Sequence, residues 1–209
     1  MAAHSDQRHA RLDGRVARSA DGVRRAVRLL EDMGAEIVEV DIPDLHGYIS
    51  AWREICTAEA VTAHAEFYPA RAEEYGPWFR SWLAYGAANS AADYARAHHL
   101  RLECNGIMAR AFRDIDFLVC PTMLGPDRRK TQAELFETPA GDFDSRRQRF
   151  TVPFDFNGAP TLTLPSGLNA NGFPLSLQFA GNPGSEALLA RAGKAYQDAA
   201  GFTALHPPL

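Results

Sequence analysis

Residues 150–160 read FTVPFDFNGAP and continue directly into residues 161–181, TLTLPSGLNANGFPLSLQFAG. Two short apolar runs in this stretch, at 161–164 and 175–180, are bounded by proline and glycine and therefore predict strands. Between them stands Asn169-Ala170-Asn171-Gly172, which has the composition of a turn. These residues predict two neighbouring strands joined by a short connection.

The chain before this stretch also contains helix and strand patterns. Apolar residues recur at helical spacing from Val23 to Met33, with Ser19 as a candidate N-cap and Gly34 at the position of a C-terminal glycine. Residues 37–42 alternate apolar and acidic side chains, a pattern typical of a half-buried strand. Residues 116–120 form a continuous apolar run, which predicts a strand buried on both faces.

Helical patterns account for much of the remaining chain. We expect helices at 48–67, at 77–85 and from Ser90 to Phe112, where Asp93 follows Ser90 in a capping-box arrangement. A closing helix should begin after Ser185. The succession of helices and strands predicts an α/β organisation.

Composition excludes several classes of protein. The 209 residues are 46% hydrophobic and carry a net charge of −4, so the chain can build a sizeable core and has no overall positive field to attract nucleic acid. The three cysteines form no C-x-x-C motif, which favours free thiols in a reducing compartment. With no secretory signal and no membrane-spanning run, we expect a cytoplasmic protein with no membrane partner.

The stretch from 150 to 181 resembles the C-terminal signature of the amidase-signature hydrolases. That pattern combines a phenylalanine-threonine-x-proline start, a glycine-x-proline turn, a proline-x-glycine turn and a proline-x-x-x-glutamine strand that ends in glycine. The matching segments here are Phe150–Pro153, Gly158–Pro160, Pro165–Gly167 and Pro174–Gly181. Residues 34–43, Ser90–Tyr94, 116–122 and the Glu186–Leu189 helix also match, in the family's order. The resemblance extends from about residue 15 to the end.

The resemblance implies the C-terminal part of the amidase-signature fold. That part is an α/β structure with a mixed β-sheet flanked by helices, and its sheet should be incomplete because both halves of the family's fold share it. We therefore expect residues 1–14 to be a disordered tail and 15–209 to form a single partial domain. Asp155 replaces a common asparagine and Ser176 a common glycine, both mild departures.

The family's catalytic residues have no counterpart in this chain. The resemblance implies a lysine base, a bridging serine in a cis peptide, and a nucleophilic serine behind a loop rich in glycine and serine. The chain has no Gly-Gly and no Ser-Ser dipeptide, and its only lysines are Lys130 and Lys194. Lys130 falls in a basic polar loop, and Lys194 is expected to face solvent. We therefore assign no catalytic residue and expect the isolated chain to be inactive.

Substitute chemistry is not indicated by the remaining polar residues. Ser166 lacks a G-x-S-x-G setting and is interpreted as a turn residue between strands. Cys120 follows an apolar run and is interpreted as a buried structural thiol. His98 and His99 do not have metal-ligand spacing with Cys104, so no metal site is predicted, and no cofactor is implied.

Four residues are candidates for the substrate-pocket wall, which the family's second half supplies. By position they are Trp52, Thr122, Gln148 and Phe154. Ordinary packing explains each of them equally well. Gln148 stands where glutamine-using amidotransferase subunits are similar in carrying an acidic residue, and its neutrality favours a different branch.

Two functions remain open from the sequence. The first is a fragment of an amidase that hydrolyses carbon–nitrogen bonds of a small-molecule amide, active only if an N-terminal half completes it. The alternative is a non-catalytic interaction or structural protein that docks on a partner chain or forms a homo-oligomer, because an incomplete sheet leaves apolar faces and strand edges uncovered. A third interpretation is a mis-assigned start or a pseudogene product, since the residues before Arg15 are unpatterned.

Overall fold

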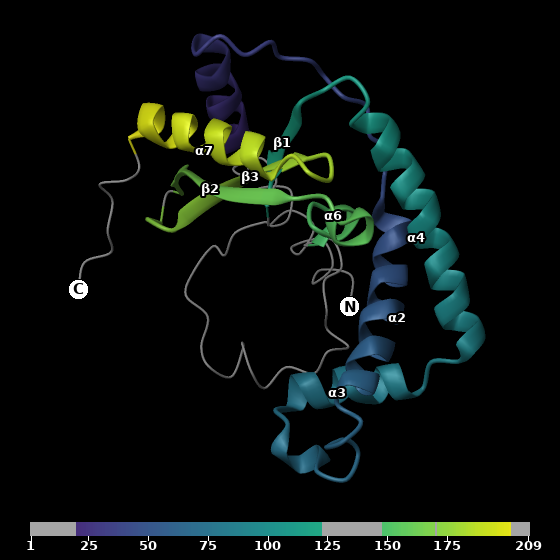
Figure 1. Cartoon of the computed structure of the whole chain (residues 1–209). Helices are drawn as coiled ribbons and strands as arrows, with labels where there is room; N and C mark the ends of the chain where they lie inside the picture. Colours follow the sequence, from purple (N-terminus) through teal and green to yellow (C-terminus); the bar gives the residue numbers. More distant parts are fainter. Residues whose placement is uncertain (1–19, 123–147, 170, 202–209) are drawn as a thin grey trace, which may run out of the picture. The chain divides into compact units, whose positions relative to one another are not determined.

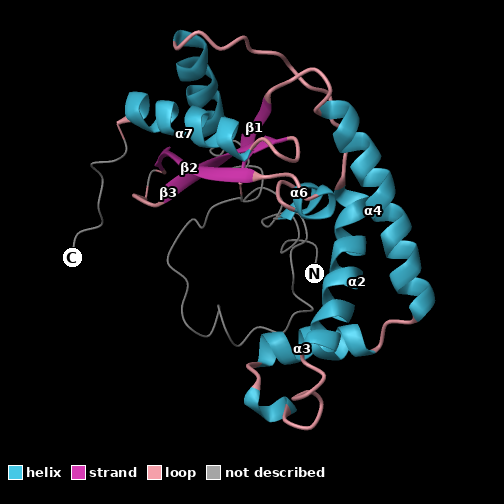
Figure 2. Ribbon diagram, viewed as in Figure 1, coloured by secondary structure: helices cyan, strands magenta, loops and turns pink. Residues whose placement is uncertain are grey.

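The computed structural model describes residues 20–122, 148–169 and 171–201. They fall into two compact units. The sheet unit comprises the described residues up to Asp41, those from Ala109 to Thr122, and those from Gly158 onward. The helical unit comprises Ile42–Met108 together with residues 148–157. Each strand shown in Figures 1 and 2 belongs to the sheet unit.

The sheet has three strands: β1 (Phe117–Pro121), β2 (Thr161–Leu168) and β3 (Pro174–Gly181). Their order is β1-β3-β2, and both pairings are antiparallel. The turn between β2 and β3 is closed by Asn169, whose side-chain oxygen accepts hydrogen bonds from the backbone N–H of Asn171 (2.9 Å) and Phe173 (3.0 Å). The predicted pair of neighbouring strands is confirmed.

The core of the sheet unit lies between the sheet and two helices, the first helix at 20–32 and α7 (Glu186–Ala200). Its buried residues come from all of these elements: Ala26, Leu30, Leu164, Leu177, Phe179, Leu189 and Tyr196. Close packing is visible at Gly193 of α7, where an added Cβ would clash with the Leu162 side chain. The Tyr196 hydroxyl also donates a hydrogen bond to the carbonyl oxygen of Pro165 (3.1 Å).

Two strand predictions are corrected in the sheet unit. Residues 37–42 are not a strand, because no described strand lies beside them to pair with their backbone. The predicted strand at 116–120 exists as β1, but each of its residues is only half-buried. It was expected to be buried on both faces; instead it is the last described strand on its side of the sheet.

The helical unit is built from α2 (His46–Ala63), the short 3-10 helix η1 (Ala72–Glu74), α3 (Pro77–Ala87), most of α4 (Ala91–Ala111) and α6 (Val152–Asn157). Helices α2 and α3 pack so closely that a Cβ on Gly86 would overlap the carbonyl group of Thr57. The predicted capping box at the start of α4 is confirmed: the Asp93 N–H donates to the Ser90 hydroxyl (3.1 Å), and the Ser90 N–H donates to the Asp93 carboxylate (3.2 Å).

The predicted α/β class is confirmed, with a sheet that is not closed. A mixed sheet was expected, but both pairings among the described strands are antiparallel. The first helix ends as expected at Gly34, which has a positive φ of 96°. Ser185 precedes α7, but its hydroxyl donates to the carbonyl oxygen of Asn182 (2.6 Å) rather than capping the helix. Residues 1–14, Ser19 and Lys130 lie outside the described residues. No helix in the described part of the chain is long and apolar enough to cross a membrane.

Candidate functional site

Trp52 belongs to an aromatic cluster in the helical unit. Its ring packs against Trp82 at 6.0 Å between centroids, and Trp82 in turn stacks on Trp78 at 5.3 Å. The Trp52 side chain also hydrogen-bonds Asp155 of α6. Since an indole carries a single N–H donor, that bond fixes which way the ring faces. Trp52 therefore joins an aromatic wall to a carboxyl group.

Helix α6 is formed by the phenylalanine-threonine-x-proline motif. The Thr151 N–H donates to the carbonyl oxygen of Gln148 (2.9 Å), while the Thr151 carbonyl accepts from the N–H groups of Phe154 (3.0 Å) and Asp155 (3.2 Å). Proline is tolerated at Pro153 because the first helical turn needs no N–H donor there. The motif thus starts a short helix that the strand and helix patterns did not predict.

The far end of α6 is held by two side chains of α4. Arg101 Nε donates to the carbonyl oxygen of Phe156 at 2.8 Å, and Asn105 Nδ2 donates to the same oxygen at 3.2 Å. Carbonyls at a helix end lack partners within the helix, so these donors satisfy one that would otherwise be unpaired. They also fix the position of α6 within the helical unit, and with it the position of Asp155.

Asp155 is an exposed residue of α6 whose carboxyl group is partly shielded from solvent by its neighbours. Burial raises the pKa of its carboxyl group above the usual value, while the Trp52 hydrogen bond opposes that shift. The nearby Cys56 thiol has its pKa raised to about 11, first by burial and then by the charges of Glu59 and Asp155. Both shifts describe a partly shielded setting that contains one carboxyl group, on the exposed residue Asp155. Such a setting can hold a small polar group by a hydrogen bond beside an aromatic wall.

The sheet unit has a candidate polar group of its own, at the end of β1. The Thr122 hydroxyl is buried and has no hydrogen-bond partner among the described residues. Beside it in the sheet, Gln178 Nε2 donates to the Cys120 sulfur (3.4 Å) and to the Pro121 carbonyl oxygen (3.2 Å). A buried, unpaired hydroxyl is costly in free energy unless water or a ligand satisfies it. Thr122 is therefore a candidate ligand contact.

The four predicted wall residues are divided between the two units. Trp52, Gln148 and Phe154 belong to the helical unit, whereas Thr122 belongs to the sheet unit. Phe154 is only 6% exposed, and the Gln148 carbonyl takes part in the turn that begins α6. Their assignment to a substrate wall stays a prediction.

Two further residues were not among the predicted site residues. Asp155 was noted only as a departure from the usual asparagine, yet its carboxyl group hydrogen-bonds Trp52 and has a raised pKa. Gln178 was noted only as part of a motif, yet it is 2% exposed and bridges β3 to β1. The signal that could have found both is the same: a polar residue inside an otherwise apolar segment must find a partner.

Substitutes for the missing nucleophile are not available at the described positions. Ser166 is 3% exposed and lies beneath the first helix, where a Cβ on Gly22 would come within 2.7 Å of its hydroxyl. It sits in β2 at a register shift, which corrects its interpretation as a turn residue. Lys194 faces solvent as predicted, paired with the Asp198 carboxylate at 2.6 Å.

The thiol of Cys120 is also in an unreactive state. Burial raises its pKa to about 11, so it is protonated at neutral pH, as expected of a structural cysteine. Within the described ranges, histidine, cysteine and acidic side chains do not gather in groups of three or more that could hold a metal ion.

Comparison with known proteins identifies the family. A family model described as Amidase matches residues 6–190. The chain belongs to the amidase family. Among its relatives are the putative amidase AmiD of Mycobacterium tuberculosis, 37% identical over 152 residues, and an amidase of Pseudomonas putida, 32% identical over 190 residues. A glutamyl-tRNA(Gln) amidotransferase subunit from Rhizorhabdus wittichii is 31% identical over 206 residues.

The alignments cover most of the length of this chain but less than half of the length of each relative. The alignments include 72%, 90% and 87% of this amidase-family chain, but only 32%, 40% and 41% of the three relatives. A crystal structure of an amidase superposes with a TM-score of 0.71 at 25% identity, over 90% of this chain and 43% of that one. The chain thus spans between a third and somewhat over two fifths of the length of the proteins it resembles.

Proposed function

We propose that this chain is the substrate-shaping C-terminal part of an amidase that hydrolyses carbon–nitrogen bonds of a small amide. In this proposal residues 15–209 form part of a larger domain, and another segment or chain supplies the lysine and the two serines. The proposal is supported by family membership and by the absence of a glycine/serine-rich loop from the 209 residues. The chain would contribute binding surface and no reacting group.

The observation that carries the proposal is the arrangement around Asp155. An aromatic wall from α2 and α3, one carboxyl group hydrogen-bonded to Trp52, and a helix held by Arg101 and Asn105 together make a rigid surface that presents a polar group beside aromatic rings. Binding sites for small molecules have this composition: mostly apolar walls and a few fixed polar groups. We assign Trp52 the role of substrate contact and Asp155 the role of positioning residue.

The test is reconstitution of an amidase from two pieces. The N-terminal part of Mycobacterium tuberculosis AmiD, which would supply the triad, is mixed with this chain, and ammonia release is measured over a panel of aliphatic and aromatic amides. Only the mixture of the two pieces should release ammonia from the amides. Turnover by this chain alone, or labelling of Ser166 by a fluorophosphonate probe, would contradict the proposal.

A matched pair of variants addresses the wall itself. W52F keeps an aromatic ring but loses the indole donor to Asp155, and it should change KM differently across the amide panel. W78F makes the same chemical change in the same aromatic stack without touching α6. If both variants change KM in the same way, Trp52 is a packing residue only.

The alternative is a non-catalytic chain that docks on a partner. It is favoured by one observation: two apolar side chains after the first helix are largely exposed, Ile37 by 42% and Val38 by 57%. This function predicts that a partner binds without any amide turnover in the reconstituted mixture. Binding with turnover supports the amidase instead.

A further inference from the structure

The aromatic rings beside Asp155 form a stack in the helical unit. Trp52 packs against Trp82 at 6.0 Å between ring centroids with the planes tilted by 59°, and Trp82 stacks on Trp78 at 5.3 Å with the planes 15° apart. Trp82 is 6% exposed, whereas Trp52 and Trp78 are only partly buried. The middle ring thus holds the stack in place, and the two outer rings keep exposed surface.

The carboxyl group of Asp155 lies at the edge of the Trp52 ring. The two side chains share a hydrogen bond, and an indole donates through its N–H, which lies in the plane of the ring. An ionised carboxylate has about four acceptor positions, so this bond leaves others for a further donor. Asp155 is an exposed residue of α6, so a ligand can approach its carboxylate from solvent.

No described cation balances the charge of Asp155. The ion pairs among the described residues use other carboxylates, those of Asp21, Glu74, Asp93 and Asp198. Burial raises the pKa of Asp155 and the Trp52 hydrogen bond opposes that shift, with no described cation contributing. Arg101, whose charge acts on the nearby Cys56 thiol, donates its Nε hydrogen to the carbonyl oxygen of Phe156 at 2.8 Å. Asp155 therefore presents a charge that the described part of the chain leaves unbalanced.

A second carboxylate, that of Glu59, adds to the negative charge of this region. Burial first, and then the charges of Glu59 and Asp155, raise the pKa of the Cys56 thiol to about 11, while Arg101 opposes them. The Tyr94 hydroxyl orients Glu59 by donating to its Oε1 at 3.2 Å. Two carboxylates and one guanidinium therefore act on the same protonated thiol, and the local balance of charge is negative.

We propose that the surface formed by Trp52, Asp155 and Glu59 selects amides that carry a positively charged ammonium group away from the scissile bond. The ammonium group hydrogen-bonds the Asp155 carboxylate and lies against the Trp52 ring, and Glu59 adds a longer-range attraction. The proposal rests on the proposed function, because it names the substrate class of the same surface. It gives Asp155 a contact with substrate in addition to its role in positioning Trp52.

An ammonium group suits this surface better than a neutral or an anionic group. It is attracted both by carboxylates and by the electron-rich face of an indole, which is the best of the aromatic rings for that contact. A neutral apolar group would cover Asp155 without pairing it, and shielding an unpaired carboxylate from water costs free energy. A carboxylate would be repelled by Asp155 and Glu59. The Arg101 guanidinium would favour an anion, but it is outnumbered by these two carboxylates.

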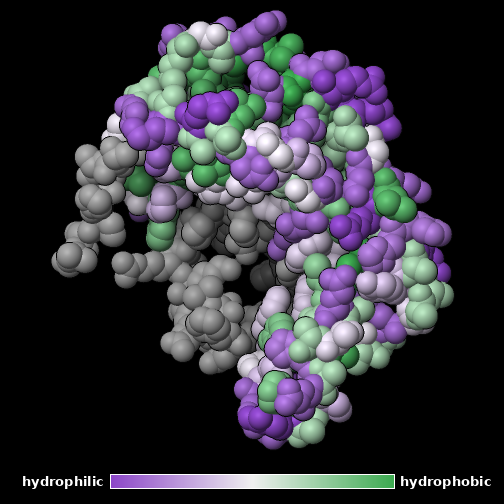
Figure 3. Space-filling model, in the orientation of Figure 1, coloured by the Kyte–Doolittle hydropathy of each residue, from purple (hydrophilic) through white to green (hydrophobic). Residues whose placement is uncertain are grey.

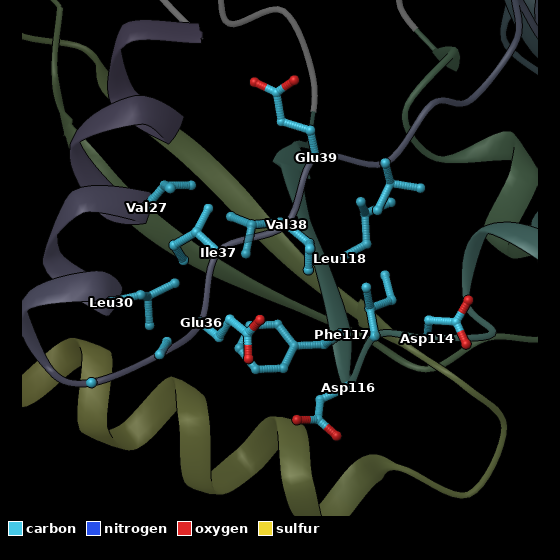
Figure 4. A pocket seen from close by; sticks show the side chains of 15 residues that line it. Val27, Leu30, Glu36, Ile37, Val38, Glu39, Asp114, Asp116, Phe117 and Leu118 are labelled. Carbon is cyan, nitrogen blue, oxygen red and sulfur yellow. The ribbon is translucent and has the colours of Figure 1, made fainter.

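Acidic charge without an indole is found elsewhere in the chain, around a cavity of about 680 Å³ in the sheet unit. Glu39, Asp114 and Asp116 contribute to its lining, and their carboxylates lie around the periphery of the view in Figure 4. The apolar part of the described lining is largely aliphatic and contains no tryptophan. Figure 3 shows hydrophobic side chains at the surface in the region of the first helix, which contributes to this lining. The cavity therefore serves as a comparison for binding that follows negative charge alone.

The first experiment measures the binding of three amides to the whole chain: δ-aminovaleramide, its uncharged counterpart hexanamide, and the anionic adipic acid monoamide. The three tryptophans of the chain all belong to the stack, so intrinsic tryptophan fluorescence reports on this surface. At neutral pH and low salt, δ-aminovaleramide should bind about threefold to tenfold more tightly than hexanamide, and the anionic amide more weakly than both. Added salt should reduce the difference, because it screens exposed charges.

Three results of this experiment would overturn the proposal. They are equal binding of δ-aminovaleramide and hexanamide, preference for adipic acid monoamide, and no change of fluorescence with δ-aminovaleramide at millimolar concentrations. Preference for the anionic amide would assign the surface to Arg101 instead.

Asp155→Asn removes the charge and keeps an oxygen that can accept the Trp52 hydrogen bond. It should lower the preference for δ-aminovaleramide over hexanamide to less than about twofold, because both amides then meet an uncharged group. The two affinities are measured on the same protein sample, so partial unfolding of the variant weakens both signals and leaves their ratio interpretable.

Asp114→Asn is the matched control. It makes the same chemical change at an exposed aspartate that lines the cavity of the sheet unit, and it should leave the preference unchanged. A similar loss of preference in both variants would mean that δ-aminovaleramide follows the negative charge of the chain in general, which contradicts the proposal.

Glu59→Gln provides a second test that does not depend on the folding of the Asp155 variant. Glu59 is exposed, and a glutamine oxygen can still accept from the Tyr94 hydroxyl. The preference for δ-aminovaleramide should fall by about twofold, the size expected for one exposed charge. An unchanged preference would count against the proposal.

The outcome is separable from that of the proposed function. A preference for δ-aminovaleramide that Asp155→Asn abolishes, without ammonia release in the mixture with the AmiD N-terminal part, keeps this inference and removes the amidase. Ammonia release with equal KM for δ-aminovaleramide and hexanamide keeps the amidase and removes this inference.

Discussion

The sheet has a closed side, formed by β2 and β3, and an open side, formed by β1 and the neighbouring residues 37 and 38. The two sides are built from similar sequence patterns but reach different degrees of burial. On one side, β2 and β3 pair with each other and lie against α7 and the first helix, so that Leu177 and Phe179 have no exposed surface. On the other side, β1 is half-buried throughout, and the neighbouring residues 37 and 38 are exposed.

The difference shows what an apolar alternation can and cannot establish. The pattern in 161–181 and the pattern in 37–42 both predict strands, but only the first finds strands and helices to pair with and pack against. A strand needs a neighbour, because its backbone groups have no partners within the strand itself. Five predictions test how far this contrast holds.

The largest effect is expected from removing an aromatic ring on the closed side. Phe179→Ala should lower the free energy of unfolding by about 3–5 kcal/mol, because the ring is fully buried among β3, β1 and α7. Phe117→Ala, in half-buried β1, should cost clearly less, although the two rings lie 4.8 Å apart. Urea unfolding measures both. Equal losses would mean that the two sides of the sheet are equally well packed.

The next effect concerns the reactivity of the Cys120 thiol. It tests whether solvent reaches the face of β1 or only its outer edge. With its pKa raised to about 11, this thiol should react with iodoacetamide at pH 8 on the order of 100-fold more slowly than a free cysteine. The rate should rise with pH up to about 11. Fast reaction at pH 8 would show that the face of β1 is also open.

The same pKa shift has a consequence for stability, with a definite sign. The unfolded thiol ionises near its ordinary pKa of 9.0, while the folded thiol stays protonated up to about 11. The unfolded state therefore binds fewer protons between these values, and the free energy of unfolding should fall as pH rises through that range. The thiols of Cys56 and Cys104 also have raised pKa values. The pH dependence of the free energy of unfolding is therefore compared between the wild-type chain and a variant with all three cysteines replaced by alanine.

A smaller effect is expected where α7 contacts β2. Tyr196→Phe removes the hydroxyl that donates to the Pro165 carbonyl oxygen and leaves the ring in place. The free energy of unfolding should fall by about 1 kcal/mol, the usual net value of such a bond, measured by urea unfolding. A loss near zero would mean that water takes the place of the Tyr196 hydroxyl at the Pro165 carbonyl oxygen. Water would then reach the closed side of the sheet despite its burial.

The smallest effect is expected on the open side. Val38→Ser should change the free energy of unfolding of the isolated chain by less than about 0.5 kcal/mol, because the side chain is already 57% exposed. Thermal unfolding measures it. A loss above about 1 kcal/mol would show that Val38 is packed within the isolated chain.

Much of the fold could be predicted, because local rules decide it. The first helix with Gly34 at its end, the capping box of Ser90 and Asp93, and the β2–β3 turn each depend on residues close together in the chain. The helix α6 was missed, because its motif is too short for a helical repeat and its far end is satisfied by Arg101 and Asn105 of α4.

The candidate site was predicted less well, for a related reason. Trp52 was named as a wall residue, but its partner Asp155 comes from a segment far along the chain, and no periodicity connects the two. The Trp52 hydrogen bond of Asp155 and its raised pKa depend on α2 and α6 meeting in the helical unit. The Thr122 hydroxyl has no hydrogen-bond partner among the described residues, and this likewise depends on what surrounds the end of β1.

The sequence was sufficient for the family, the α/β class, the positions of most helices and the β2–β3 pair, because these follow from motifs and short-range periodicity. Tertiary structure alone decided that 37–42 and the outer edge of β1 have no strand partner among the described residues, that Ser166 lies under the first helix and that Asp155 hydrogen-bonds Trp52. The physical reason is that pairing and burial are relations between distant segments. A strand pattern states what a segment can do, and its neighbours in space determine whether it does so.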